Sequence, residues 1–295
     1  MQLQRAREYQ LTVGDWKNGD GLLIENLQVT FDISKSSNNK DRTNSATIEI
    51  YNLSDESLKV LDTDYPVAVF SAGYKEIGIK QLFAGEVALV TTRKSGSDRI
   101  TQLRLGSGYT ELNHQLLSKL VSPGKNVKDV LEEIRKAIPS VSRGVYNGTN
   151  LNNELLYGYP LTGTPKQMLD ELSAKYLIDW QINDDVLYVH DKTRANNEDF
   201  ASAYVISKYT GLIENAYRVT DDVKKSTKDK TKKQAVQFKM LLNPDIVAGS
   251  IIKLEDTLIQ GWYKVETLRH YGGYRDSDFY TEVKATAIEK VVNTK

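Results

Sequence analysis

The amino-acid sequence predicts an α+β protein that is mainly β, in which two strand-rich regions flank a central segment that contains helices. Apolar and polar residues alternate in the N-terminal third and again in the C-terminal third, which is typical of half-buried strands. Between these regions, two segments space their apolar residues for one face of a helix. A chain of 295 residues is long enough for two or three domains, and we expect them at 1–113, 114–203 and 204–295.

The composition excludes several classes of protein. The 39 basic residues equal the 39 acidic ones, which argues against a general binder of nucleic acid or of membrane surfaces. The chain has no cysteine, so disulfides, thiolate metal sites and thiol nucleophiles are excluded. The first residues, MQLQRAREYQ, lack an apolar segment and no apolar run is long enough for a membrane span, so we expect neither a secretory signal nor membrane insertion.

The N-terminal region is predicted to be a set of strands with one short helix. Alternation runs over 27–34 and resumes over 46–52 after a polar stretch, which predicts a hairpin with a long loop. Ser54 then caps a short helix that ends near Leu61 and has acidic residues in its first turn. Further strands are expected at 67–74, 81–94 and 99–106.

The central segment contains two predicted helices and a hairpin. The first helix covers 127–138, because its apolar residues share one face, Asn126 precedes it and Pro139 ends it. The second covers 164–176, with Thr164 as N-cap and Pro165 at the first helical position. Strands at 178–182 and 186–191 follow, joined by a turn of Asn and Asp.

The C-terminal region returns to strands and repeats part of the N-terminal region. Strands are predicted at 235–242, 250–256, 261–270 and 278–288. With Gly85 set against Gly261, the residues that match at identical spacing are Val87 with Tyr263, Leu89 with Val265, Thr91 with Thr267 and Arg93 with Arg269. After a turn longer by four residues, Thr101, Leu103 and Leu105 match Thr281, Val283 and Ala285. The match favours two related β units, although any two hairpins share a period-two pattern.

A lysine-rich stretch precedes the strand at 235–242. Residues 221–234 contain six lysines among Asp, Ser and Thr, which predicts an exposed loop or hairpin tip. We expect this loop to contact a partner protein through Lys224, Lys225, Lys228, Lys230, Lys232 and Lys233.

No catalytic, cofactor or metal site is predicted. The acidic pairs at 184–185 and 221–222 lie in hydrophilic turns, where Asp is favoured for its backbone geometry. His114, His190 and His270 have no partner histidine at metal-binding spacing, and no glycine-rich phosphate loop precedes a helix. We therefore expect no enzyme activity, no cofactor and no metal.

Three segments resemble baseplate hub proteins of contractile-tailed, Mu-like bacteriophages, and together they cover about two thirds of the chain. The first has a strand that ends in F-x-I, a polar loop and N-x-A-x-I-x-I-Y-N-L-S, here Phe31, Ile33, Asn44, Ala46, Ile48, Ile50, Tyr51, Asn52, Leu53 and Ser54. The second is the helix and hairpin at 164–192, with Trp180 and Leu187-Tyr188-Val189 as landmarks. In the third, the landmarks are Leu242-Asn243-Pro244, Gly249, Tyr263-Lys264-Val265 and His270.

The resemblance implies a structural virion protein with two related tube-like β-barrel domains and small α+β modules inserted between them. Hubs of this family are trimers, so three copies of two barrels imitate a sixfold ring that stacks on the tail tube. A spike subunit is expected below the ring, tail tube or tube-adaptor proteins above it, and other baseplate proteins around it. The implied location is the tail baseplate of a virion assembled in the host cytoplasm.

One face of the N-terminal strands is a candidate channel wall. If the apolar residues of the hairpin at 27–34 and 46–52 fill a barrel core, the alternate residues face a channel for DNA, namely Gln28, Thr30, Asp32, Thr47 and Glu49. Neutral and acidic side chains there keep the DNA backbone from binding as it passes. Ordinary solvent exposure of this face is the competing interpretation.

Two other function classes are competing interpretations. A cell-envelope or carbohydrate-binding module is suggested by the segment 165–190, which loosely resembles small peptidoglycan-binding modules, and by the seventeen tyrosines. Such a module predicts a monomer with an exposed aromatic platform. A hydrolase predicts a pocket with clustered Asp, Glu or His, for which the sequence shows no pattern.

Overall fold

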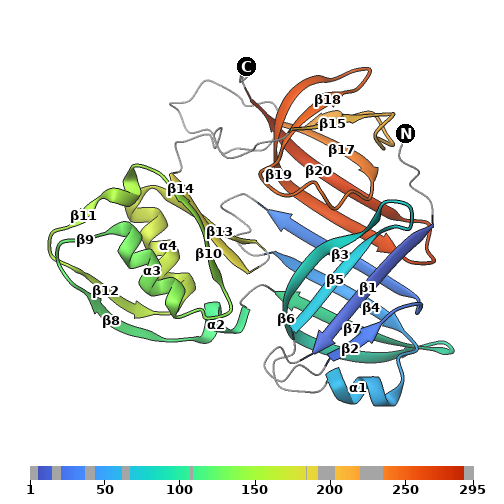
Figure 1. Ribbon diagram of the computed structural model, residues 1–295, viewed down its shortest axis with the longest axis horizontal. Helices are drawn as coiled ribbons and strands as arrows, with labels where there is room; N and C mark the ends of the chain where they lie inside the picture. The colour runs from blue at the N-terminus through green and yellow to red at the C-terminus, as the bar shows by residue number, and fades with distance from the viewer. Residues whose placement is uncertain are drawn as a thin grey trace.

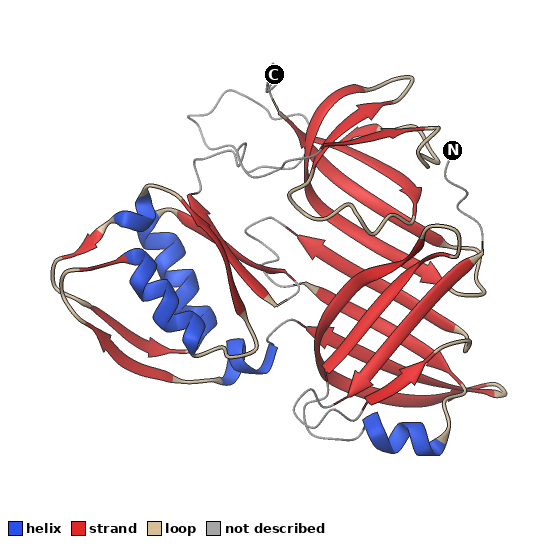
Figure 2. Ribbon diagram, viewed as in Figure 1, coloured by secondary structure: helices blue, strands red, loops and turns tan. Residues whose placement is uncertain are grey.

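A computed structural model describes residues 6–14, 21–36, 44–61, 67–106, 109–183, 185–191, 203–219 and 235–288 (Figure 1). Strands dominate both terminal regions, and the helices gather in the central module apart from one short helix near the N-terminal strands (Figure 2). Among the described residues, no helix is long and apolar enough to cross a membrane.

Both β regions belong to one thirteen-stranded sheet. The N-terminal region supplies β1 (Arg7–Gly14), β2 (Gly21–Ile24), β3 (Val29–Ser36), β4 (Ser45–Tyr51), β5 (Val67–Tyr74), β6 (Gly78–Ser95) and β7 (Asp98–Gly106). The C-terminal region supplies β15 (Ala203–Ser207), β16 (Tyr217–Val219), β17 (Ala235–Leu241), β18 (Ile251–Glu255), β19 (Gln260–Gly273) and β20 (Phe279–Ala287). The strand order is β16-β17-β20-β19-β3-β4-β7-β6-β5-β1-β2, with β18 and β15 attached beside β19.

The two regions meet at β3 and β19. These strands pair antiparallel from Thr267 opposite Ser36 to Gly273 opposite Thr30, a contact between residues more than two hundred positions apart in sequence. The pairing satisfies the backbone donors and acceptors that β3 and β19 would otherwise expose as sheet edges. One continuous wall therefore runs from β6 through β7, β4, β3, β19 and β20 to β17 (Figure 1).

The same pairing accounts for a difference from the expected closed barrels. Each terminal sheet curls around its own core, but within the described residues neither is closed by a strand pairing. In the N-terminal region, closure would require β2 to pair with β3. Both edges of β3 are already occupied, one by β4 and the other by β19. The mainly β class is confirmed, whereas two closed barrels are not.

The N-terminal core is completed by residues of the C-terminal region. Phe279 is 2% exposed and lies among the N-terminal core residues, with ring centroids 5.7 Å from Phe31 and 5.4 Å from Tyr74. The Arg7 guanidinium lies over the Phe279 ring at 5.0 Å. It also donates hydrogen bonds to backbone oxygens of the turn between β19 and β20, to Gly273 at 3.0 Å, Ser277 at 2.8 Å and Asp278 at 3.1 Å. The first strand is therefore fastened to the last hairpin.

The central module has a separate apolar core. Its elements are α2 (Tyr109–His114), β8 (Leu117–Val121), β9 (Lys125–Asn126), α3 (Val127–Lys136), β10 (Ser142–Asn147), η1 (Asn150–Asn152), β11 (Glu154–Leu155), β12 (Tyr159–Gly163), α4 (Pro165–Tyr176), β13 (Ile178–Asn183) and β14 (Val186–Asp191). The helices pack on the sheet of β10, β14 and β13, where Trp180 is 1% exposed.

Both long helices of this module begin as the sequence predicts. Asn126 and Asp129 form a reciprocal capping box at the start of α3, and Thr164 and Gln167 form another at the start of α4. Each box satisfies backbone donors that the first helical turn leaves without intrahelical partners. The remaining helix, α1 (Asp55–Leu61), follows β4 with Asp55 and Glu56 in its first turn. The expected division at 113/114 and 203/204 stays a prediction.

Candidate functional site: a sheet face and two strand edges

The five residues predicted to face a channel lie at one surface of the wall. On β3 and β4, Thr30, Asp32, Thr47 and Glu49 alternate with fully buried core residues, so they project away from the core. Gln28 directly precedes β3 and is half-buried. The structure therefore brings the predicted residues together on one face. Whether that face lines a channel stays a prediction.

The electrostatic character of this face differs from the sequence-based expectation. Asp32 accepts hydrogen bonds from Arg269 across the β3–β19 junction, with Nε to Oδ1 at 2.9 Å and Nη2 to Oδ2 at 2.6 Å. Glu49 Oε1 accepts hydrogen bonds from Arg93 Nη2 at 2.9 Å and from Gln102 Nε2 at 3.0 Å. Both carboxylates are thus paired with arginines, so the face is not an acidic surface. The reason is tertiary, because each arginine comes from a strand that only the sheet order brings near its acid.

The half of the face beside β20 carries aromatic and cationic side chains. The Arg269 guanidinium lies 4.6 Å from the Tyr271 ring centroid, and Lys239 Nζ lies 4.4 Å from that of Tyr280. The two tyrosine rings meet edge to face at 5.9 Å. The hydrogen bonds that Arg269 donates to the Asp32 carboxylate raise the pKa of Arg269. Cations that stack on rings and pair with acids are held in place on this face.

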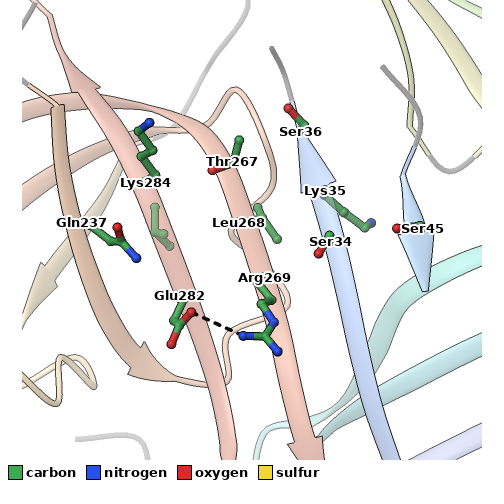
Figure 3. Close-up of a pocket in the computed structure, with 11 residues that line it drawn as sticks. Ser34, Lys35, Ser36, Ser45, Gln237, Thr267, Leu268, Arg269, Glu282 and Lys284 are labelled. Atoms are coloured by element: carbon green, nitrogen blue, oxygen red, sulfur yellow. Dashed lines mark ion pairs between the residues drawn. The ribbon is translucent and has the colours of Figure 1, made fainter. Parts of the chain in front are cut away.

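A polar cavity of about 490 Å³ opens on this face at the β3–β19 junction (Figure 3). Lys35 lies at the edge of the cavity and is 5% exposed. Arg269 and Glu282 form an ion pair in its lining, with Nη1 and Oε2 3.9 Å apart. The other lining residues are Ser34, Ser36, Ser45, Gln237, Thr267, Leu268, Val283 and Lys284. No described group of three or more His, Asp or Glu side chains could hold a metal ion.

The two histidines whose pKa values shift are unsuited to proton transfer at neutral pH. Burial, with a contribution from Lys35, lowers the pKa of His270 to about 3, and its Nδ1 lies 2.9 Å from Thr281 Oγ1. Burial, with a contribution from Lys264, lowers the pKa of His190 to about 4. Both are neutral imidazoles at pH 7, and both occupy structural positions, one under the sheet junction and one on β14.

The wall ends in strand edges. On β6, the edge opposite β7 pairs with β5 only as far as Glu86, and within the described residues no strand covers it from 88 to 95. At the other end, β16 pairs with β17 through Tyr217–Val219, and the described residues leave its outer edge uncovered. Backbone groups at such edges are available for another strand. The two edges lie at opposite ends of the wall in the strand order.

The two hairpins of the internal repeat, β6–β7 and β19–β20, align through their β-bulges. The register shifts between Val87 and Leu89 in the first hairpin and between Val265 and Thr267 in the second. The neighbouring strands agree with this alignment, because Val67 lies opposite Glu86 just as Ile251 lies opposite Lys264. Hence β5 corresponds to β18, β6 to β19 and β7 to β20.

This alignment corrects part of the match seen in the sequence. Thr101 and Thr281 do occupy equivalent positions. With these threonines aligned, Gln102 corresponds to Glu282. Thr91 lies opposite Gln102 and Arg269 lies opposite Glu282, so Thr91 corresponds to Arg269 and not to Thr267. The sequence match in β6 was therefore wrong by two residues. A shift of two keeps every side chain on its face, so alternation alone does not detect it.

The six lysines predicted to contact a partner lie outside the described residues. Sequence reasoning did not identify the long-range contacts made by Arg7, Arg93 and Arg269. A guanidinium with several donors suits such contacts, but no spacing rule connects Arg7 with a turn near residue 276.

Comparisons with known structures find the same fold in two tail proteins. The structure resembles the tail protein from Neisseria meningitidis MC58, with a TM-score of 0.63 and 12% identity over 94% of this chain and 96% of that one. It also resembles the 43 kDa tail protein of prophage MuSo2 from Shewanella oneidensis, with a TM-score of 0.64 and 9% identity over 95% and 96% of the two chains.

A third similar structure comes from a secretion machine. It is an E. coli component of the type VI secretion system, described as similar to T4 tail proteins gp27 and gp5, with a TM-score of 0.59 and 9% identity over 89% of this chain and 74% of that one. At these identities the likeness shows a shared fold. No curated protein sequence matches the chain significantly.

The fold is thus one that two tail proteins and a component of the type VI secretion system share. The family model described as baseplate hub gp41 matches residues 10–285, and the chain belongs to this family. The resemblance to Mu-like baseplate hubs inferred from sequence motifs is confirmed.

Proposed function

We propose that the protein forms the trimeric hub of a phage baseplate, where it joins a sixfold tail tube to a threefold spike. The observation that carries the proposal is the β3–β19 junction, which sets two related strand sets side by side in one wall. A subunit that contributes two similar wall segments lets three copies build a ring of six. Such a ring matches the tube above with its six segments and the spike below with its three subunits.

The face that carries Gln28, Thr30, Asp32, Thr47 and Glu49 lines the channel of this ring. Its acids are paired with arginines, which supports passage of DNA without specific binding, because few unpaired cations are presented to phosphates. The central module then lies outside the wall and forms an outer or lower part of the baseplate (Figure 1). Assembly takes place in the host cytoplasm, and the role is structural, without enzyme activity.

Size-exclusion chromatography with light scattering tests the trimer. A hub trimer has three times the monomer mass of 33.3 kDa. Electron microscopy of the assembled baseplate then tests the arrangement, since a threefold ring with six similar lobes around a channel is expected. A baseplate image in which this chain lies outside the central ring would overturn the proposal.

The lysine-rich loop is proposed to contact a partner ring or the spike. We expect replacement of Lys224, Lys225, Lys228, Lys230, Lys232 and Lys233 by alanine to reduce co-purification with tube or spike proteins while the monomer stays folded. Unchanged assembly would remove the loop from the interface.

A carbohydrate-binding role is a second candidate, because the central module exposes an aromatic residue. Tyr157 is 92% exposed and its neighbour Leu156 is 71% exposed, at the turn before β12. The two functions differ in their prediction for Tyr157→Ala. Loss of sedimentation with purified cell wall supports sugar binding, whereas loss of binding to other baseplate proteins supports the hub.

A further inference from the structure

We infer, on the basis of the ring proposed above, that the uncovered edge of β6 pairs with β16 of a second copy, in the register that β19 and β3 use within one chain. The predicted partners are Thr91 opposite Val219, Thr92 opposite Arg218 and Arg93 opposite Tyr217 of the next copy. The β6–β16 contact between subunits therefore has the same strand register as the β19–β3 contact inside each subunit.

The argument begins with the correspondence between β6 and β19. The N-terminal half of β19 pairs with β18 on one edge, and along the same edge its C-terminal half, from Thr267 to Gly273, pairs with β3. The N-terminal half of β6 pairs with β5, the counterpart of β18, and its C-terminal half has no strand on that edge among the described residues. The position equivalent to β3 beside β19 is thus vacant beside β6.

The strand that matches the vacant position is β16. In the N-terminal region β3 pairs with β4 and β4 pairs with β7, with Ile33 opposite Ala46 and Ala46 opposite Leu105. In the C-terminal region β16 pairs with β17 and β17 pairs with β20, with Arg218 opposite Val236 and Val236 opposite Ala285.

Since Leu105 and Ala285 occupy equivalent positions, Arg218 is the counterpart of Ile33. Carrying over the observed pairing of His270 with Ile33 then gives the pairing of Thr92 with Arg218. Side-chain contacts across the two hairpins support this equivalence, because Thr92 Oγ1 lies 3.3 Å from Thr101 Oγ1 just as His270 Nδ1 lies 2.9 Å from Thr281 Oγ1.

The residues at the two edges suit strand pairing. The β6 edge reads Ala-Leu-Val-Thr-Thr from 88 to 92, where β-branched residues favour a strand, and Leu89 is 47% exposed. Tyr217 on β16 is 53% exposed, and in the inferred register it lies beside Arg93, whose guanidinium can stack on its ring. Natural edges that stay unpaired are often protected by proline or charge, and the segment 89–92, which follows the bulge at 87–89, contains neither.

The geometry requires a second copy. The two edges lie at opposite ends of the wall, separated by the strands β7, β4, β3, β19, β20 and β17. Within one molecule the edges of β6 and β16 are too far apart to pair. When β16 of a second copy pairs with β6 of the first, β6 of the second copy is still available to β16 of a third. This head-to-tail contact closes into a ring when the rotation permits it.

Disulfide cross-linking tests the register, and the absence of native cysteine makes the readout unambiguous. The full-length variant with Thr91→Cys and Val219→Cys is oxidised over a range of concentrations and run on a non-reducing gel. We expect ladders at two and three times 33.3 kDa. Directly opposite residues fall within the Cα separation of about 4.4–6.8 Å that a disulfide requires.

Two controls define the outcome. The variant with Thr91→Cys and Tyr217→Cys places the sulfurs in a register shifted by two residues, about 7–8 Å apart, and is expected to cross-link at least about tenfold less. The variant with Ser34→Cys and Arg269→Cys joins partners already opposite each other and should form a disulfide within one chain, which verifies oxidation and folding.

The inference is overturned if the two Thr91 variants cross-link equally. It is also overturned if neither Thr91 variant cross-links while the intrachain control forms its disulfide completely. If light scattering then still reports a trimer, the proposed hub stands and a different surface closes it. If the chain elutes as a monomer but cross-links in the inferred register, the strand pairing is supported. The ring then forms only in the presence of the tube or spike proteins.

Discussion

Replacement of Phe279 by alanine is expected to destabilise the whole β structure, although this residue begins the last strand. Its side chain is 2% exposed and fills the N-terminal core between Phe31 and Tyr74. Truncating a buried phenylalanine costs about 3–5 kcal/mol, through lost transfer free energy and the cavity left behind. Two edge-to-face ring contacts and the Arg7 cation over the ring place Phe279→Ala towards the upper end of that range.

Urea unfolding followed by circular dichroism at strand wavelengths measures this cost as the change in midpoint multiplied by the m-value. Leu258→Ala is the matched control, because Leu258 is 73% exposed in the same C-terminal region and its truncation should change stability by less than about 0.5 kcal/mol. The expected result is one shifted transition. A Phe279→Ala loss below about 1 kcal/mol, or a separate early transition that leaves the N-terminal strands at the wild-type midpoint, would refute the shared core.

Three further predictions concern the junction, the central module and pH. Breaking the exposed Asp32–Arg269 ion pair should cost only about 0.2–1 kcal/mol in a double-mutant cycle, and the coupling should fall as salt rises. Asn126→Ala removes the side-chain cap of α3 and should lower the stability of the central module by about 1 kcal/mol, measured by Trp180 fluorescence in urea; an unchanged midpoint would mean that the cap contributes nothing. Burial lowers the pKa of His270 to about 3. Between about pH 6.5 and pH 3, this imidazole is therefore protonated in the unfolded chain but neutral in the folded chain. Stability should therefore be complete above about pH 6.5 and fall progressively towards pH 3, and His270→Gln should flatten that slope in pH-dependent thermal melts.

Local structure followed closely from local sequence. The capped starts of α3 and α4 were readable because a capping box needs only four consecutive residues and an adjacent apolar face. Most predicted strands lie within about two residues of the observed ones, since alternation persists wherever one face of a sheet is buried. The strands β1, β2, β8, β9, β10, β11, β12, β15 and β16 were missed, and most of them are five residues or shorter, which leaves little room for a period-two pattern.

The candidate site was only partly readable. The face of β3 and β4 followed from alternation, but its charge did not, because Arg93 and Arg269 reach Glu49 and Asp32 from strands distant in sequence. The internal repeat was visible, yet the alignment of β6 with β19 was set two residues off. Only the bulges at 87–89 and 265–267 and the neighbouring strand pairs determine it. The expected closed barrels failed for a similar reason, since β19 occupies the edge of β3 that would close the first one.

By itself, the chain of amino acids determined which segments become strands and helices, which face of each is apolar, and which family the motifs resemble. These properties depend on neighbours a few positions apart, where periodicity and capping act. The tertiary structure alone decided that the two strand sets share a wall and that Phe279 completes the other region's core. It also decided that, within the part of the chain that the structure describes, the wall leaves strand edges of β6 and β16 uncovered. Strand pairing between distant segments depends on backbone groups that every residue carries, so side-chain patterns do not specify which edges meet.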